Sequence, residues 1–283
     1  MQHVGVRLVS DGGDLGLEVV AKVRRLRGSL PAQQHITGEF SDQRFDPGRT
    51  VVFFESATVR RVNFSGVRFE AFLTRGSTFT ECDFSRIKSG TYRSDLSSVP
   101  PSVYSDCRFD RADLRAFDPG AARFERCSFR GSKIDGWNTT EAEFVDCAFT
   151  GRIKQARFWG QPYGVLADRL ERTINEFRGN DFSGADLWDV SFVKGIDIDA
   201  QRWPAGAEYI RLDRMQERLN QVRRQVVHWA NPHARQEALI MLQVLQEDVE
   251  LNQNALFARR ATLSGGLPDR ERVWDMLAAS LDE

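Results

Sequence analysis

The chain lacks the features that mark membrane, secreted and nucleic-acid-binding proteins. No apolar run approaches the roughly 20 residues that cross a bilayer, and the opening residues Met1–Val4 show no basic start followed by an apolar stretch. We therefore expect a cytoplasmic protein without membrane contact. Lys and Arg number 39 against 40 Asp and Glu, so the basic surplus of direct nucleic-acid binders is missing and we expect no direct nucleic-acid contact.

Catalytic motifs and metal-ligand spacings are missing too. We find no phosphate-binding loop, dinucleotide fingerprint or nucleophile elbow. Among only four cysteines, Cys107, Cys127 and Cys147 recur at long, equal intervals with no histidine beside them, unlike zinc ligands. We expect these three to form a ladder of buried free thiols. The sequence thus predicts no catalytic, cofactor-binding or metal-binding residue, and a protein that is not an enzyme.

What the chain has instead is a large apolar residue at every fifth position through its middle. A period of five is neither the 3.6 of a helix nor the 2 of a strand. A short fixed repeat is typical of a solenoid, in which each coil buries its apolar residues by stacking on the next. The register holds in three runs, which comprise Phe54, Val59, Phe64, Phe69, Phe79 and Phe84; Tyr104, Phe109, Leu114, Phe124, Phe129, Ile134, Phe144 and Phe149; and Phe177, Phe182, Leu187 and Phe192.

A small or slender residue stands two positions before most of these large ones. The clearest units are Val62-Asn63-Phe64-Ser65-Gly66 and Asn180-Asp181-Phe182-Ser183-Gly184. Over roughly residues 36–198 the sequence resembles the pentapeptide repeat family, whose unit is a small residue, Asp or Asn, Leu or Phe, and two further residues. The resemblance implies a mainly β protein, a right-handed quadrilateral β-helix in which four pentads make one square coil.

Residues four pentads apart would then stack inside the solenoid. This spacing predicts three internal columns, made up of Phe64, Phe84, Tyr104, Phe124 and Phe144; of Phe69, Phe109, Phe129 and Phe149; and of Leu114 and Ile134. In some pentads a smaller residue takes the large position and an aromatic one precedes it by two, as in Phe117 and Pro119. Because interiors keep a nearly constant density, we interpret these as swapped pairs with the ring inward. The alternative is an outward turn at residues 118–120 that exposes Phe117.

The pattern divides the chain into three parts. Residues 1–34 contain a short alternating strand and a possible helix, which together would cap the N-terminal end. Residues 35–203 carry the repeat, with breaks near 86–103 and 159–174 that read as loop insertions, although the first could also hold an irregular coil. Residues 204–283 change to a helical period and predict a helical hairpin followed by a short third helix.

The C-terminal part shows apolar residues at alternating spacings of three and four, typical of an a/d stripe. Two structures would bury this stripe. One is an intramolecular hairpin that caps the last coil, and the other is a homodimeric coiled coil in which Asn252 fixes the register. The two stripes comprise Leu212, Met215, Leu219, Val222, Val226 and Trp229, and Leu242, Leu245, Val249, Asn252 and Leu256.

Two functions remain for such a chain. The first is a non-catalytic scaffold whose partner is another protein. The second comes from the resemblance, because some pentapeptide repeat proteins are similar to DNA in width and charge, bind DNA gyrase and protect it from antibiotics or toxins. To replace DNA in the binding site of gyrase or a topoisomerase, such a protein needs a strongly negative surface. Residues 35–198 of this chain carry a net charge of only about −1. The acidic residues would have to gather on one face, and the candidates are Asp106, Asp110, Glu125, Glu141, Glu143 and Asp146.

Overall fold

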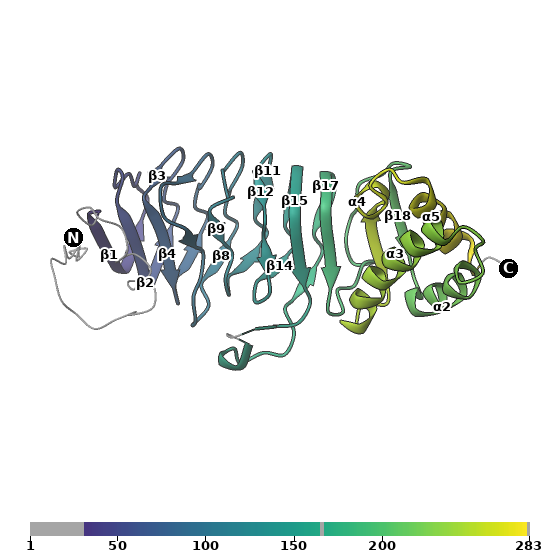
Figure 1. Cartoon of the computed structure of the whole chain (residues 1–283). Coiled ribbons are helices and arrows are strands. Elements are labelled where there is room, and N and C mark those ends of the chain that lie inside the picture. The colour runs from purple at the N-terminus through teal and green to yellow at the C-terminus, as the bar shows by residue number, and fades with distance from the viewer. Residues whose placement is uncertain (1–30, 165–166, 282–283) are drawn as a thin grey trace.

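The computed structural model describes residues 31–164 and 167–281, and shows an elongated stack of parallel strands with a helical unit at its C-terminal end (Figure 1). The expected N-terminal strand and helix cap lies almost wholly outside the described residues. None of the helices in the described ranges is long and apolar enough to cross a membrane. The expectation of a mainly β protein is confirmed.

The strands are short because each pentad supplies only a few extended residues before the chain turns a corner. Several corners are non-glycine residues with positive φ, such as Asp106 at 56° and Arg126 at 50°. The strands of the stack are β1 (Gln33–Ser41), β2 (Val51–Arg60), β3 (Arg68–Phe69), β4 (Ala71–Arg75), β5 (Thr78–Thr80), β6 (Lys88–Ser89), β7 (Ser94–Asp95), β8 (Val103–Ser105), β9 (Phe117–Asp118), β10 (Arg123–Glu125), β11 (Ser128–Arg130), β12 (Ile134–Asp135), β13 (Asn138–Thr139), β14 (Glu143–Val145), β15 (Ala148–Trp159), β16 (Phe177–Arg178) and β17 (Asp181–Val193).

All of these strands pair in parallel with strands of the neighbouring coils. Phe124 in β10 lies level with Tyr104 in β8 and with Phe144 in β14, which is the spacing of four pentads that the repeat predicts. Longer strands such as β15 bend around corners, so that one strand pairs with β11, β12 and β13 in turn. The parallel sheet is therefore curled into the successive coils of a β-helix, as the repeat predicted.

One coil is longer than the coils beside it, and this corrects two predicted columns. Phe79 pairs with Tyr104 and not with Val99, because segment 86–103 adds one pentad to its coil. Phe84 therefore stacks on Phe109, with ring centroids 4.9 Å apart, and Tyr104 does not continue the column of Phe64 and Phe84. Phe69 is level with Ser89 and not in the column of Phe109. The segment is an irregular coil that contains β6 and β7.

The observed register gives four inward positions in a coil, illustrated by Phe124, Phe129, Ile134 and Thr139 on β10–β13. The longest aromatic column runs through the Phe129 position, and its consecutive rings are nearly parallel with centroids 4.6–5.0 Å apart. It comprises Phe64, Phe84, Phe109, Phe129, Phe149 and Phe182. A second column comprises Phe79, Tyr104, Phe124 and Phe144, and a third contains Leu114 and Ile134.

The aromatic residues of the swapped pairs lie inside the stack. Phe72 and Phe117 are fully buried and Trp137 is 2% exposed, while the Trp137 ring nitrogen donates to the carbonyl of Leu114 at 3.2 Å. The exposed turn considered for Phe117 is therefore not formed. Gly120 completes this tight coil with φ of 53°, and a Cβ there would come within 2.0 Å of the Ser97 carbonyl oxygen.

All four cysteines are free and buried, and each thiol lies against a carbonyl of the preceding coil. Cys127 Sγ donates to Tyr104 O at 3.2 Å, and Cys147 Sγ donates to Phe124 O at 3.5 Å. Cys107 makes the equivalent contact with the Phe79 carbonyl. Burial raises the pKa of Cys127 well above its ordinary value, which keeps this thiol neutral.

The C-terminal unit begins with a two-stranded antiparallel ladder, β18 (Tyr209–Leu212) and β19 (Leu256–Arg259), which faces the last coil. Phe257 of β19 stacks on Trp203 at 4.4 Å, which extends the aromatic core of the stack. The Gln253 side chain accepts from the amides of Gly195 and Ile196 and donates to the Ile196 carbonyl, as a neighbouring strand would. These contacts cover strand groups that an open β-helix would leave unpaired.

In the described part of the chain, helices complete this unit, and a short turn of 3₁₀ helix lies separately in the loop between β15 and β16. The helices are α2 (Met215–Val226), α3 (Pro232–Glu250), α4 (Arg260–Ser264) and α5 (Pro268–Ala279), and the 3₁₀ turn is η1 (Ala167–Arg169). Asn231 caps α3 by accepting from the amides of His233 and Ala234. Asn252 follows α3 with φ of 62°, the left-handed conformation that ends a helix.

Four residues of the predicted helical stripes are therefore not on helices. Leu212 lies in β18, Leu256 in β19, and Trp229 in the connection between α2 and α3. Asn252 lies in the turn after α3, where it cannot set the register of a coiled coil. The other stripe residues pack on one another and on α5 in a second core. Its fully or nearly fully buried members include Met215, Leu219, Val222, Val226, Leu242, Leu245, Val273, Trp274 and Leu277, with Trp229 and Val249 partly buried beside them.

Candidate functional site

The widest departure from the coil outline is the loop between β15 and β16, which extends away from the body of the stack (Figure 1). Its coil is long because Phe144 pairs with Phe177, well beyond the next four pentads. Two large side chains stand out on it, Tyr163 with 53% of its surface exposed and Ile174 with 63%. This is the segment that the sequence marked as an insertion near 159–174, and we call its described residues 160–164 and 167–174 the projecting loop.

The projecting loop is fixed at both ends by buried polar and aromatic contacts. Asn175 is 2% exposed, and its amide nitrogen donates to the carbonyls of Thr140 at 2.9 Å and Trp159 at 3.1 Å. Its backbone amide donates to Gly160 O at 2.9 Å and closes the loop. At the other end, the rings of Trp159 and Tyr163 stack with centroids 4.9 Å apart.

Arg172 ties the loop to the neighbouring coils. Its guanidinium lies 3.3 Å from a carboxylate oxygen of Glu143 and donates to the carbonyl of Glu141. Burial lowers the pKa of Arg172, while the charge of Glu143 acts in the opposite direction. The Lys194 ammonium lies 5.4 Å from the centre of the Tyr163 ring, in a cation–π contact. The loop thus has ordered ends, where the side chains of Tyr163 and Ile174 remain exposed.

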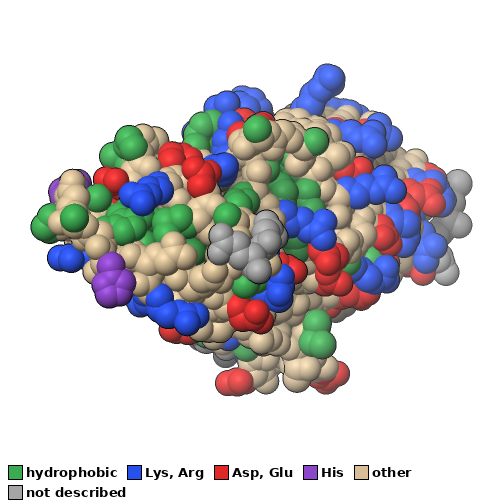
Figure 2. Space-filling model, turned by 90° about the vertical axis from the view of Figure 1, so that its right-hand side faces the viewer, with side chains coloured by type: hydrophobic (Ala, Val, Ile, Leu, Met, Phe, Trp, Pro, Cys, Tyr) green, Lys and Arg blue, Asp and Glu red, His purple; other side chains and the backbone are tan. Residues whose placement is uncertain are grey.

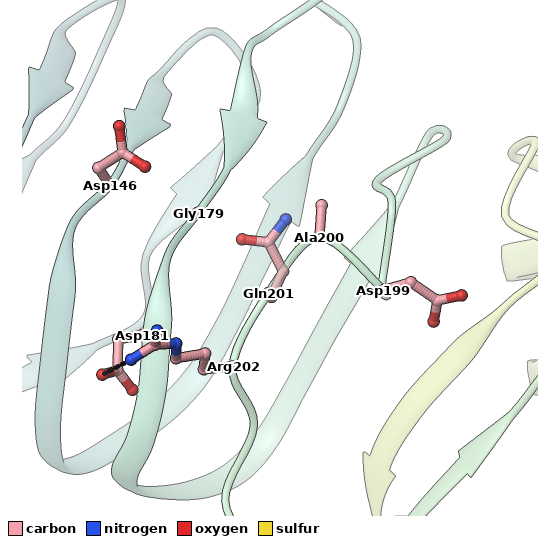
Figure 3. Close-up of a pocket in the computed structure, with 7 residues that line it drawn as sticks. All are labelled: Asp146, Gly179, Asp181, Asp199, Ala200, Gln201 and Arg202. Atoms are coloured by element: carbon pink, nitrogen blue, oxygen red, sulfur yellow. Dashed lines mark ion pairs between the residues drawn. The ribbon is translucent and has the colours of Figure 1, made fainter.

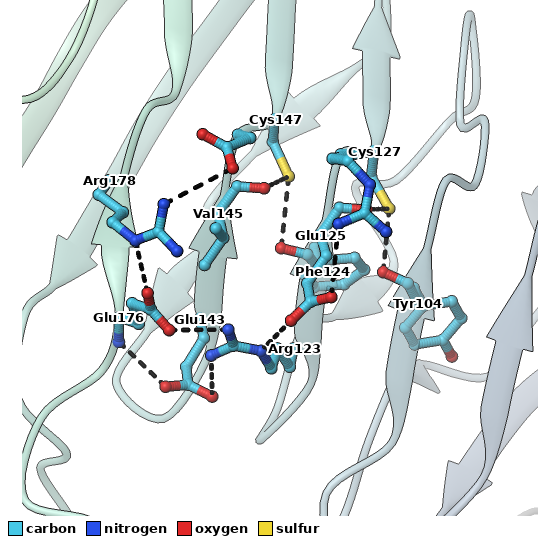
Figure 4. A network of polar contacts seen from close by, with 12 residues as sticks. Tyr104, Arg123, Phe124, Glu125, Cys127, Glu143, Val145, Cys147, Glu176 and Arg178 are labelled. Carbon is cyan, nitrogen blue, oxygen red and sulfur yellow. Dashed lines mark hydrogen bonds and ion pairs between the residues drawn. The ribbon is translucent and has the colours of Figure 1, made fainter.

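A network of charged side chains continues from Arg172 across the adjoining strands (Figure 4). Arg123 on β10 contacts three carboxylates, Glu125 at 2.6 Å, Glu176 at 2.7 Å and Glu143 at 3.2 Å. Arg178 contacts Glu176 at 2.6 Å on the next coil. Burial works to lower the pKa of Arg123, but the three carboxylates outweigh it and raise the pKa above its ordinary value. The network holds neighbouring coils together and its charges compensate one another.

Acidic residues and arginines share the adjacent corner of the coils. In chain order this corner holds Asp42, Arg61, Glu81, Asp106, Arg126 and Asp146, and we call it the mixed edge. Arg61 binds Asp42 at 2.6 Å, and Arg126 binds Asp106 at 2.7 Å. The hydrogen bond from Arg61 is the main cause that lowers the pKa of Asp42.

The acidic residues proposed for a DNA-like stripe do not form one. Asp106, Glu125 and Glu143 are each paired with an arginine. Asp146 lies 3.7 Å from Arg178, while Asp110 accepts from Ser128 and from the Arg130 amide on a different part of the coil. Burial raises the pKa of Glu141, which disfavours the charged form of this carboxyl.

A shallow hollow lies beside the last coil, lined by Asp146, Gly179, Asp181, Asp199, Ala200, Gln201 and Arg202 (Figure 3). Asp181 points toward Arg202 at 4.0 Å, and Asp199 is bound by Arg211. Within the described ranges, no group of three or more His, Cys, Asp or Glu has the arrangement of a metal site. The charged residues of the hollow are thus already paired with neighbours.

Sequence reasoning placed its candidate residues mainly in the interior. The column residues and the cysteine ladder are buried and support the surface without forming it. Tyr163, Ile174, Arg172 and Asn175 were not singled out, although the break in the five-residue period at this segment was the available signal. Where the five-residue period is interrupted, no spacing rule indicates which side chains are anchored and which are exposed.

No protein-family model and no curated protein sequence matches the chain. Among solved structures, full-length QnrB1, a plasmid-mediated fluoroquinolone resistance protein, aligns over 61% of this chain and 82% of its own at 18% identity, with a TM-score of 0.26. A trypsin-treated variant of QnrB1 aligns over 59% and 78% at 20% identity, with a TM-score of 0.25.

HetL, a pentapeptide repeat protein involved in heterocyst differentiation regulation from the cyanobacterium Nostoc sp., aligns over 69% of this chain and 99% of its own at 13% identity, with a TM-score of 0.17. Superpositions at these scores carry no argument by themselves, so the relationship depends on the repeat and the coil register of the chain itself. In those two features the chain resembles the pentapeptide repeat proteins.

Proposed function

We propose that this protein is a non-catalytic interaction scaffold that holds its projecting loop against a partner protein. The observation that carries the proposal is the contrast within the loop, whose base is tied down by Asn175 and Arg172 while Tyr163 and Ile174 are exposed. A loop that is already ordered loses less entropy on binding. Aromatic side chains on such a loop are frequent energetic centres of protein interfaces.

The remainder of the proposal concerns the body that supports the loop. We propose that residues 35–203 close as a right-handed quadrilateral, and that residues 1–34 and 204–283 act as end caps. The four inward positions in a coil and the contacts of Gln253 and Phe257 with the last coil support this arrangement.

A DNA-mimicking protector of gyrase or a topoisomerase is the alternative from the family resemblance. Mimicry of duplex DNA needs a continuous field of one sign. Arginines interrupt the acids of the mixed edge at Arg61 and Arg126, and most acids beside it are paired, as in the contacts of Arg123 with Glu143 and Glu176. The charge arrangement therefore favours the scaffold over the mimic.

The test is affinity capture with a variant that truncates only the two exposed side chains. The double variant Tyr163→Ala and Ile174→Ala should capture its main partner from host lysate at least about tenfold less than the wild type, because truncating an interface centre costs about 2 kcal/mol or more. A matched control is Val227→Ala with Leu267→Ala, which are 43% and 44% exposed elsewhere. Both variants should melt as the wild type does.

Equal capture by the loop variant and the wild type would contradict the proposal. Recovery of gyrase or topoisomerase subunits as the main partner would favour the mimic instead. A purified protein that turned over a substrate would contradict the non-catalytic role.

A further inference from the structure

Cations gather without partners at and beside the corner of the coils that runs between the Phe109 and Leu114 columns. We call this the basic edge, and it consists of Arg68, Arg86, Lys88, Arg108, Arg111, Arg130 and Lys133. All seven are exposed. Among the described residues, none of them has a carboxylate within ion-pair distance, whereas the arginines Arg61 and Arg126 of the mixed edge are paired.

Like charges are neighbours along this edge. Arg68 in β3 is directly paired with Lys88 in β6. The Arg86 amide bonds to the Asp110 carbonyl, and the Arg111 amide bonds to the Arg130 carbonyl, which brings these side chains into adjacent coils. Neighbouring coils lie about 4.8 Å apart. Like charges placed opposite each other on paired strands destabilise a sheet, so stability alone gives no reason for this arrangement.

The acids within the edge do not neutralise it. Asp113 lies between Lys88 and Lys133 but is bound by two guanidinium nitrogens of Arg115, each at 2.8 Å. Asp110 accepts from Ser128 and the Arg130 amide, and Asp83 accepts from the Ser85 amide at 2.9 Å. Seven cations against three such acids leave the edge clearly positive.

We infer that the basic edge binds an acidic segment of a partner protein. The guanidinium fork suits carboxylates, and five of the seven cations are arginines. From Arg68 to Lys133 the edge spans three coil steps, about 14 Å. Carboxylates on alternate residues of an extended chain recur at roughly 6.6 Å, so a short acidic run matches its length.

Nucleic acid fits this edge less well. The whole chain has a net charge of −1 and lacks the basic surplus typical of nucleic-acid binders. Single-strand binders stack bases on exposed aromatic rings, but Phe84, Phe109 and Phe129 beside this edge are buried.

The basic edge is also separate from the projecting loop. The loop leaves its coil after Phe158 and rejoins it before Phe177, between the inward positions of Thr139 and Phe144, whereas the basic edge lies between those of Phe129 and Ile134. This inference therefore goes beyond the proposed loop contact and can fail separately from it.

The experiment measures binding of a fluorescent oligoglutamate peptide by anisotropy at low and high salt. The variant Arg86→Gln, Lys88→Gln and Arg111→Gln should bind about tenfold more weakly. The control Arg61→Gln, Arg126→Gln and Arg178→Gln removes the same charge from exposed positions of the mixed edge and its neighbour, and should bind as the wild type does. Binding should weaken as salt rises, since the contacts are exposed.

The basic-edge variant should melt at or above the wild-type temperature, because it removes like-charge neighbours. If it does not fold, Arg111→Gln alone should still weaken peptide binding relative to Arg126→Gln. No saturable binding of the peptide at low salt, equal loss in both triple variants, or stronger competition by single-stranded or duplex DNA of equal charge would overturn the inference.

Discussion

At the scale of single residues, the chain separates side chains that stack from side chains that pair. Phe129 lies between Phe109 and Phe149 with ring centroids 5.0 and 4.9 Å away. Outside, Arg123 is held by three carboxylates from three coils. Adjacent residues of the repeat, such as Arg123 and Phe124, can therefore have entirely different roles, and the five-residue period identifies the inward residue at once.

Asp95 provides a prediction for the dependence of stability on pH. Burial, with the nearby charges of Asp118 and Glu141, raises the pKa of Asp95 to about 7, although the Ser97 amide donates to its carboxylate. A carboxyl whose folded pKa is raised stabilises the fold while protonated, and this contribution is lost as pH rises from about 4 through about 7. Stability should therefore fall over this range.

The variant Asp95→Asn keeps the acceptor oxygen and removes the charge. Its melting temperature should exceed that of the wild type at pH 8 and match it near pH 4, as followed by circular dichroism. Glu39→Gln, at an exposed position of β1, serves as the control and should not alter the pH profile. A wild-type profile that is flat between pH 4 and 8, or unchanged by Asp95→Asn, would contradict the assignment.

At the scale of elements, the C-terminal helices use their apolar stripe within the chain. Leu219, Val222 and Leu242 are fully buried in the core shared by α2, α3 and α5. The surface of this end shows hydrophobic side chains in separate areas with charged ones between them (Figure 2). A homodimer built on the same stripe would require these helices to leave that core.

Two substitutions distinguish an intramolecular helical core from a homodimeric coiled coil. Leu219→Asp places a charge in the core and should lower the free energy of unfolding by about 4 kcal/mol or more. Val244→Asp, at a position 41% exposed on α3, should change it by less than about 1 kcal/mol. Urea unfolding and light scattering measure stability and oligomeric state. If Leu219→Asp instead gave a stable folded monomer from a dimeric wild type, the stripe would be an intermolecular coiled coil.

The sequence predicted some elements better than others for identifiable physical reasons. The inward positions follow the period, so Phe64, Phe109 and Ile134 were placed inside directly. The partners of these residues depend on coil length, and Tyr104 was assigned to the wrong column because segment 86–103 keeps the five-residue phase while adding one pentad. Leu256 follows helical spacing by coincidence, since Asn252 had already ended the helix.

At the scale of the whole molecule, coil length determines which charges become neighbours. The lengthened coil between Phe79 and Tyr104 brings Arg86 beside Arg111 and Glu81 beside Asp106. If this coil had only four pentads, Arg86 and Glu81 would each lie beside a different residue of the next coil. The later extension from Phe144 to Phe177 puts the projecting loop outside the stack without interrupting its aromatic columns. The surface proposed for binding is thus a consequence of where the repeat is lengthened.

The central claim is therefore that the coils form one continuous stack, in which the coil from Phe79 to Tyr104 contains five pentads instead of four. Disulfide trapping tests it most directly, because Thr80 and Ser105 are paired residues on neighbouring parallel strands. Paired strands lie about 4.8 Å apart, within the range that a disulfide bridges. On mild oxidation the variant Thr80→Cys with Ser105→Cys should cross-link within one chain, and Thr80→Cys with Pro100→Cys should not. Cross-linking of the second pair and not the first would show a uniform coil of four pentads and contradict the account.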